Sequence, residues 1–220
     1  MPIRRLLAAS VLFAAIAGAH AVEPPTPQQV SSFFRAVQMD DAGTVRKMVG
    51  AVVNANELNP LGGEPALVLA VREGAMRVFQ VLLRHPATDL EAQAMNGNTA
   101  LMMAAFKRDE EVVRALLKKG AKVNQPGWTA LHYAAASGDD KIAQLLIEHG
   151  AKLDAVSPRS SGAFTPLMLA AREGKDATAR LLVARGANTA LKNTEGHAAA
   201  QIARQAGRDE LARELTAPAR

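Results

Sequence analysis

The strongest constraint on this chain is an internal repeat whose copies start 30 to 36 residues apart. Three copies open with a threonine and a largely apolar stretch, at 99–105, 129–135 and 165–171. In each copy a Gly-Ala pair begins 21 residues after that threonine, at Gly120, Gly150 and Gly186. A Leu-Leu pair lies between these landmarks, at 116–117, 145–146 and 181–182. A fixed period of this length is typical of a solenoid, in which each unit stacks on its neighbours.

Weaker copies extend the repeat toward both ends of the chain. The six copies start near residues 31, 65, 99, 129, 165 and 198. This order of landmarks, with Thr-Ala-Leu or Thr-Pro-Leu first and Leu-Leu and Gly-Ala later, resembles the ankyrin repeat. The resemblance covers about residues 27–216. It implies an all-α ankyrin-repeat solenoid of about six helix-turn-helix units with β-hairpin fingers.

The residue types at the fixed positions suit such units. The opening threonine can cap the first helix of a unit by accepting a backbone N–H, and glycine commonly ends a helix in a left-handed conformation. The alanine pair keeps the first helix thin, and the leucine pair fills the layer between units. We therefore expect Leu117 and Leu146 to be buried. Before the first unit, Thr26 and Gln29 have the spacing of a capping box.

The first 21 residues have the pattern of a cleavable export signal. Arg4 and Arg5 precede an apolar run at 6–18, and 19–21 (Ala-His-Ala) matches the small-x-small site of signal peptidase. The run is shorter than the roughly 20 residues of a membrane-spanning helix, and an uncleaved anchor is the alternative. Residues 22–26 then form a linker and 217–220 a C-terminal tail. The chain thus resembles small exported bacterial ankyrin-repeat proteins, and we expect it in the periplasm or, alternatively, secreted.

Composition and charge narrow the kinds of partner. The chain has no cysteine, so it has neither disulfides nor a lipid anchor. Beyond the signal, basic residues exceed acidic ones by three and are spread evenly. That excess is too small to predict nucleic-acid binding. No later segment is apolar enough to span a membrane.

The residues capable of chemistry form no catalytic or metal-binding pattern. No pair of histidines has metal-ligand spacing, and cysteine ligands are absent. His132 occupies the histidine position of the repeat, where the resemblance implies hydrogen bonds within and between units. Ser137 stands beside no evident base. We expect no enzyme activity, no cofactor and no metal.

Two fingers depart from the regular length. The 30-residue spacing shortens the finger at 124–128, and the 36-residue spacing lengthens the finger at 154–163. Fingers project beside the concave surface of the solenoid, where insertions alter binding more than the core. Drift in a tolerant loop is the alternative.

Partners of ankyrin repeats usually contact the finger tips and exposed positions of the first helices, here just before each start residue and four, seven and eight residues after it. These positions hold the single Trp, the single Tyr and two of the six Phe, all in units 3 to 5. Aromatic and Met side chains with a basic rim are favoured at protein interfaces. The predicted protein-binding residues are Trp128, Phe164, Phe106, Tyr133, Met103, Met95, Lys107 and Arg172. Packing of the tryptophan on a neighbouring unit is the alternative.

Together these features predict a non-catalytic protein–protein interaction module. We expect a monomer that binds, inhibits or protects an exported protein partner. The alternative is a structural protein that associates with itself through the same concave patch.

Overall fold

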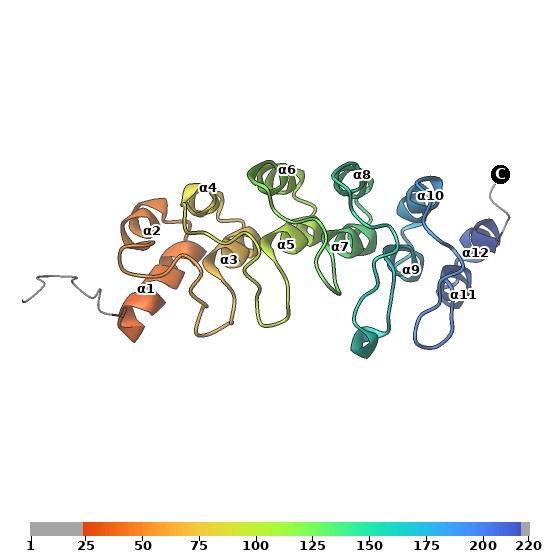
Figure 1. The fold of residues 1–220 in the computed structure, drawn as a ribbon, viewed down its shortest axis with the longest axis horizontal. Coiled ribbons are helices and arrows are strands. Elements are labelled where there is room, and N and C mark those ends of the chain that lie inside the picture. Colours follow the sequence, from red (N-terminus) through yellow and green to blue (C-terminus); the bar gives the residue numbers. More distant parts are fainter. Residues whose placement is uncertain (1–23, 217–220) are drawn as a thin grey trace, which may run out of the picture.

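The structure, a computed structural model, describes residues 24–216. The predicted signal peptide at 1–21, the first two linker residues and the tail at 217–220 lie outside the described residues. The described part is a row of paired helices (Figure 1). Their bounds are α1 Pro27–Gln38, α2 Ala42–Met48, α3 Ala66–Glu73, α4 Met76–Arg84, α5 Ala100–Lys107, α6 Glu110–Lys119, α7 Ala130–Ser137, α8 Asp140–Glu148, α9 Pro166–Arg172, α10 Asp176–Ala184, α11 Ala199–Gln205 and α12 Asp209–Thr216. None of these helices is long and apolar enough to cross a membrane.

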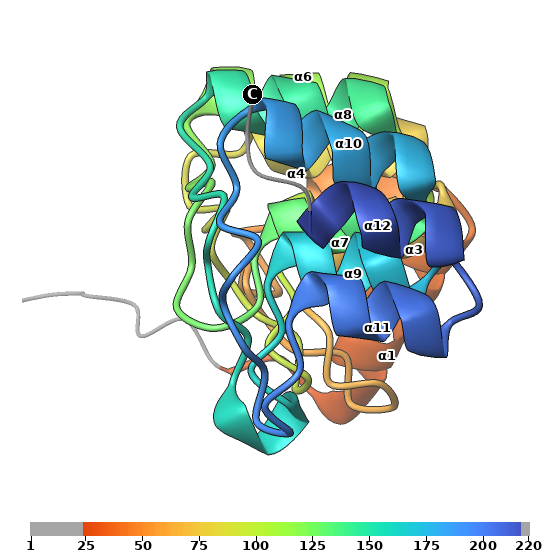
Figure 2. The same cartoon turned by 90° about the vertical axis from the view of Figure 1, so that its right-hand side faces the viewer.

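The helices form two layers, and each of the six units contributes one helix to each layer. The inner layer runs α1, α3, α5, α7, α9, α11, with each helix in contact with the next. The outer layer lies above it in Figure 1 and forms the convex side of a shallow arch, while the fingers hang below the inner helices. Figure 2, which looks along the row from its C-terminal end, shows the layers stacked and the long loops gathered on one side. The inner helices and the fingers therefore frame the concave side.

The start of each repeat coincides with the start of an inner helix. Residues 65, 99, 129, 165 and 198 are the N-cap positions of α3, α5, α7, α9 and α11. The Thr99 and Thr165 hydroxyls accept the backbone N–H of the third helical residue, Met102 and Met168, at 3.4 and 3.3 Å. Residue 31 instead lies one turn inside α1, which begins at a capping box. There the Thr26 hydroxyl accepts the Gln29 N–H at 3.2 Å, and the Gln29 side chain accepts the Thr26 N–H at 2.8 Å.

The core lies between the two layers and between neighbouring units. Leu117 and Leu146 are buried, as the repeat predicts, and Leu116 and Leu182 are buried with them. The alanine pairs of α5, α7 and α9 are completely buried, so these inner helices approach closely. Gly120 ends α6 with a φ of 97°, a left-handed conformation that disfavours residues with a Cβ.

The fingers are turns and do not form the ladders of extended β-hairpins. Over residues 24–216 the β-pairing outside helices consists of two isolated bridges, Val49–Val53 and Leu58–Pro65. Several fingers close with one backbone hydrogen bond, such as the 2.9 Å bond from the Ala94 N–H to the Asn98 carbonyl. These fingers are too short for more than one such backbone hydrogen bond between their two sides. Neighbouring fingers are joined by side-chain bonds, as where Asp154 accepts the Asn188 N–H at 2.9 Å, and by single backbone bonds, as where the Gly162 carbonyl accepts the Thr194 N–H at 2.9 Å.

The two irregular fingers contact each other. The long finger contains a short 3-10 helix, η1 (Arg159–Ser161), and closes with a 2.9 Å bond from the Ser157 N–H to the Phe164 carbonyl. A Cβ on Gly127 of the short finger would lie only 3.2 Å from Pro158 of the long one. The extra length of one finger is therefore packed against the shortened finger beside it.

Candidate protein-binding site

Three aromatic residues from different parts of the repeat meet on the inner helices of units 3 and 4. Phe106 lies near the end of α5, Trp128 ends the short finger, and Tyr133 lies in α7. The ring centroids of Phe106 and Tyr133 are 6.1 Å apart at an interplanar angle of 85°, and those of Trp128 and Tyr133 are 6.2 Å apart. Edge-to-face rings at such distances attract each other beyond their burial of apolar area. We call Phe106, Trp128 and Tyr133 the aromatic cluster.

The aromatic cluster lines an open depression with a volume of about 370 Å³. The other residues that line it come from α7, α9 and the residue after α9: His132, Ala136, Leu169, Arg172 and Glu173. Phe106 is the most exposed ring of the cluster, with 55% of its surface accessible, whereas Trp128 and Tyr133 are half-buried. The depression thus offers one free ring beside two partly packed ones.

Tyr133 links this depression to the preceding finger. Its hydroxyl donates a hydrogen bond of 2.5 Å to the side-chain oxygen of Asn98, a residue that closes the unit 3 finger. Burial raises the pKa of Tyr133 above its ordinary value, against a lowering by the Asn98 bond. The phenol therefore stays protonated and holds the finger and α7 together.

His132 supports the aromatic cluster from beneath. It is completely buried, its Nδ1 accepts the Thr129 N–H at 3.1 Å, and its Nε2 donates to the Phe164 carbonyl at 3.0 Å. Burial lowers the pKa of His132 to about 4, because the charged imidazole would lose its hydration. The bond to Thr129 lies within unit 4 and the bond to Phe164 joins unit 4 to the finger of unit 5, which confirms the structural role predicted for this histidine. The Trp128 ring packs edge-on against it, with centroids 5.3 Å apart.

Phe164 and Arg172 extend the surface toward the C-terminal end. The Arg172 guanidinium lies 4.7 Å from the centre of the Phe164 ring and is paired with Glu173 at 3.0 Å. A cation over an aromatic face is attracted by the ring quadrupole. Both residues also line a second depression of about 480 Å³, together with residues of α11 and the last finger. Because Arg172 lines both depressions, they form one continuous surface over units 3 to 6.

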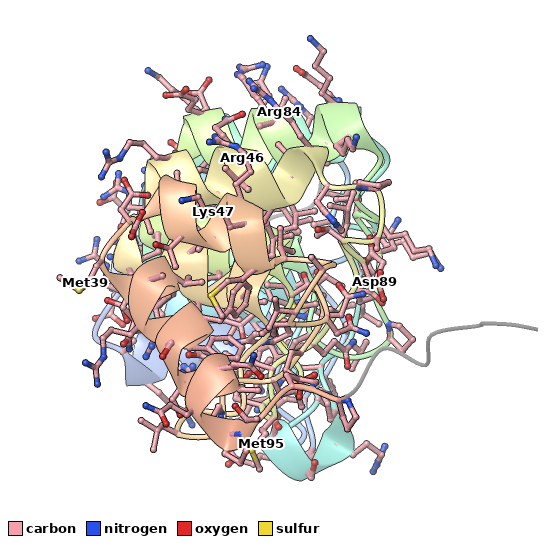
Figure 3. All side chains as sticks on the ribbon, turned by 90° about the vertical axis from the view of Figure 1, so that its left-hand side faces the viewer. Met39, Arg46, Lys47, Arg84, Asp89 and Met95 are labelled. Carbon is pink, nitrogen blue, oxygen red and sulfur yellow. The ribbon has the colours of Figure 1, made fainter. Side chains whose placement is uncertain are left out.

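The other three predicted residues do not line these depressions. Met95 is 85% exposed, and its N–H bonds to the Gly63 carbonyl at 3.0 Å, so it sits on the fingers of units 2 and 3. Figure 3 shows it at the finger end of the molecule, far from the outer helices. Met103 packs against the core and is half-buried. The Lys107 ammonium donates to the Arg72 carbonyl at 2.9 Å, at the end of α3.

The positional rule for exposed residues is wrong at several sites. Four residues after the start, Leu69, Leu169 and Ile202 are buried, and only Met103 and Tyr133 are partly accessible. The residues before the start are also buried in two units, as Glu64 and Asn98. The inner helices pack side by side, which covers these positions. The C-terminal ends of the inner helices remain accessible to solvent. Glu173, at such an end, lines the depression although it was not among the predicted binding residues.

Ser137 and the acidic residues before two outer helices have structural partners. The Ser137 hydroxyl donates to the Ala134 carbonyl at 3.1 Å, within its own helix. The acidic residues before α6 and α8, Asp109 and Asp139, cap those helices at 3.1 and 3.0 Å. Within residues 24–216, no three His, Asp or Glu side chains gather as a possible metal site.

This arrangement defines a class of protein: a helical solenoid with a continuous, partly aromatic surface along its inner helices. Two family models agree with it. The model described as "Ankyrin repeats (3 copies)" matches residues 33–126 and 67–157, and the model "Ankyrin repeat" matches residues 164–194. The chain belongs to the ankyrin-repeat family. Repeats of this family mediate protein–protein interactions and are typically non-catalytic, so the chain is a protein-interaction module.

Curated proteins with similar repeats include Neurogenic locus notch homolog protein 1 of Xenopus laevis, 36% identical over 83 residues. The same protein of Mus musculus and Neurogenic locus notch homolog protein 2 of Homo sapiens are each 35% identical over 89 residues. The matches cover 38% to 40% of this chain but only 3% to 4% of those proteins. The similarity is thus confined to a repeat segment of far longer chains.

Proposed function

We propose that the protein captures one exported protein partner in the periplasm, on the concave side of units 3 to 5. The observation that carries this proposal is the aromatic cluster around an open depression of about 370 Å³. Aromatic side chains in such a setting are common interface anchors, because they bury much area at a small entropic cost. Arg172 and Glu173 at the rim supply charges that orient a partner.

The export half of this proposal rests on the sequence at 1–21. Cleavage after Ala21 would release the chain beyond the inner membrane, where an interaction module could inhibit or protect an exported enzyme. Secretion to the medium is the alternative destination. Fractionation of expressing bacteria, followed by immunoblotting, separates these outcomes from a cytoplasmic one.

The test of the binding site compares Phe106→Ala with the unchanged protein as baits in a periplasmic extract. Because Phe106 is the most exposed ring of the cluster, its removal should leave the melting temperature unchanged. Loss of the partner that the unchanged bait captures would support the site. Equal capture by both baits would contradict it.

Two further variants separate binding from packing. Trp128 and Phe164 are half-buried. The Trp128 ring packs against the His132 ring, and the Phe164 carbonyl accepts the hydrogen bond from His132. Trp128→Ala and Phe164→Ala that lose capture at an unchanged melting temperature would place both rings in the interface. A lowered melting temperature would assign them to packing between units. Light scattering of the purified protein tests the alternative, since self-association through the same patch predicts a dimer that Phe106→Ala dissociates.

A further inference from the structure

The outer surface of the first two units carries positive charge that acidic residues balance only in part, at Arg77. The outer helices α2 and α4 hold four basic residues and no acidic one: Arg46, Lys47, Arg77 and Arg84. By contrast, α6, α8, α10 and α12 each carry at least one acidic residue in the first turn. Figure 3 shows Arg46, Lys47 and Arg84 together on the outer helices, at the opposite end of the view from Met95.

A groove of about 310 Å³ lies between α2 and α4 at this charged surface. Its lining combines three arginines with apolar side chains, and none of the described residues that line it is acidic. These lining residues are Arg46, Val49, Arg77, Gln80, Val81, Arg84, His85 and Pro86. We call this the α2–α4 groove. The groove therefore presents guanidinium groups to an anionic ligand and apolar side chains to its hydrophobic groups.

Two of the three arginines have unused binding capacity. Arg77 pairs with Asp40 at 2.9 Å, whereas Arg46 and Arg84 are exposed and form no ion pair within residues 24–216. Guanidinium groups bind carboxylates through two parallel hydrogen bonds, which favours them over ammonium groups for this purpose. The corresponding groove between α6 and α8 is different, because it mixes both charges and contains an Arg114–Glu110 pair at 2.7 Å.

We propose that the α2–α4 groove is a second binding site, and that its ligand is an acidic segment of a protein. Carboxylates of that segment pair with Arg46 and Arg84, and an apolar side chain between them packs against Val81 and Pro86. The groove lies in the outer layer, whereas the aromatic cluster lies on the inner helices. The protein can therefore hold ligands on both sides of the arch at once.

Two other anionic ligands fit the groove less well. An anionic membrane attracts basic residues near its surface, but this attraction is weak without an apolar anchor. The large exposed apolar residues of the described chain, such as Met39 and Met95, lie outside α2 and α4. A single-stranded nucleic acid would need aromatic rings for base stacking, and none lines the groove. An acidic polypeptide uses both the charges and the apolar lining.

The test is a fluorescence anisotropy titration of the purified protein with a short labelled peptide rich in Glu and Leu. Arg46→Glu/Arg84→Glu should weaken binding by about tenfold or more, because two attractive charge pairs become repulsive. The matched control, Arg114→Glu/Lys141→Glu, makes the same charge change on the α6–α8 surface and should bind as the unchanged protein does. Phe106→Ala should also bind normally, which keeps this site separate from the concave one.

Circular dichroism checks that each variant is folded. If Arg46→Glu/Arg84→Glu does not fold, the neutral variant Arg46→Gln/Arg84→Gln takes its place. Weaker binding in higher salt, and loss of binding when the peptide carries Gln in place of Glu, would support the proposal. Equal weakening by both charge-reversal variants would overturn it, because the effect would then be general electrostatics. Tighter binding of phosphatidylglycerol vesicles or of oligothymidine than of the acidic peptide would also overturn it.

Discussion

Acid should destabilise this protein through one residue, His132, before its carboxylates are protonated. The imidazole is completely buried, and its Nδ1 accepts a hydrogen bond, so the folded protein holds it in the neutral form. Its pKa is about 4 in the folded state, below the ordinary value of 6.5. Between these two values the unfolded chain binds a proton that the folded chain does not. The free energy of unfolding therefore falls as the pH drops below 6.5 and levels off below 4.

The size of the effect follows from the two pKa values. Relative to pH 7.5, the His132 contribution falls by about 2 kcal/mol at pH 5 and by about 3 kcal/mol at pH 4. Asp40, Asp41 and Glu214 have pKa values in the folded state that lie below their ordinary values. Their contributions to stability are therefore lost only at lower pH, as the pH falls through these folded pKa values. The window between pH 7 and pH 5 thus isolates the histidine from these carboxyl groups.

Urea denaturation followed by circular dichroism measures the free energy of unfolding across this window. His132→Gln cannot titrate, so its stability should depend less on pH than that of the unchanged protein, whatever its absolute stability. NMR titration of the His132 ring protons gives the folded pKa directly. Equal pH slopes for the two proteins, or a measured pKa near 6.5, would refute the reasoning.

Three further predictions concern the repeat, the export signal and the concave surface. Leu146→Ala should lower the free energy of unfolding by about 2–5 kcal/mol, because Leu146 is fully buried between units, and an unchanged melting temperature would mean that the register is wrong. Mass spectrometry of the exported protein should find Val22 at its N-terminus, whereas a membrane-bound chain that retains Met1 would refute cleavage. For an identified partner, Phe106→Ala should weaken binding by about 2 kcal/mol or more in calorimetry, and an unaltered affinity would place the anchor elsewhere.

The repeat determined most of the fold without tertiary information. Each unit needs its neighbours to bury its apolar face, so fixed residues at fixed spacings specify the local helices and the contacts between units together. The N-cap role of Thr99 and the burial of Leu146 follow from the same register. The buried, hydrogen-bonded state of His132 was also predictable, since it occupies a fixed position of the repeat.

Only the tertiary structure decided which variable positions are accessible. Leu69 and Tyr133 occupy equivalent positions in the sequence, because both lie four residues after the start of a repeat. Leu69 is nevertheless buried, whereas Tyr133 is partly exposed. Accessibility at these positions depends on neighbouring units, whose side chains and finger lengths vary independently. The same holds for the α2–α4 groove, where Arg46 and Arg84 lie 38 residues apart in the sequence. Stacking of consecutive units places them along one groove, because equivalent positions of a solenoid become neighbours in space.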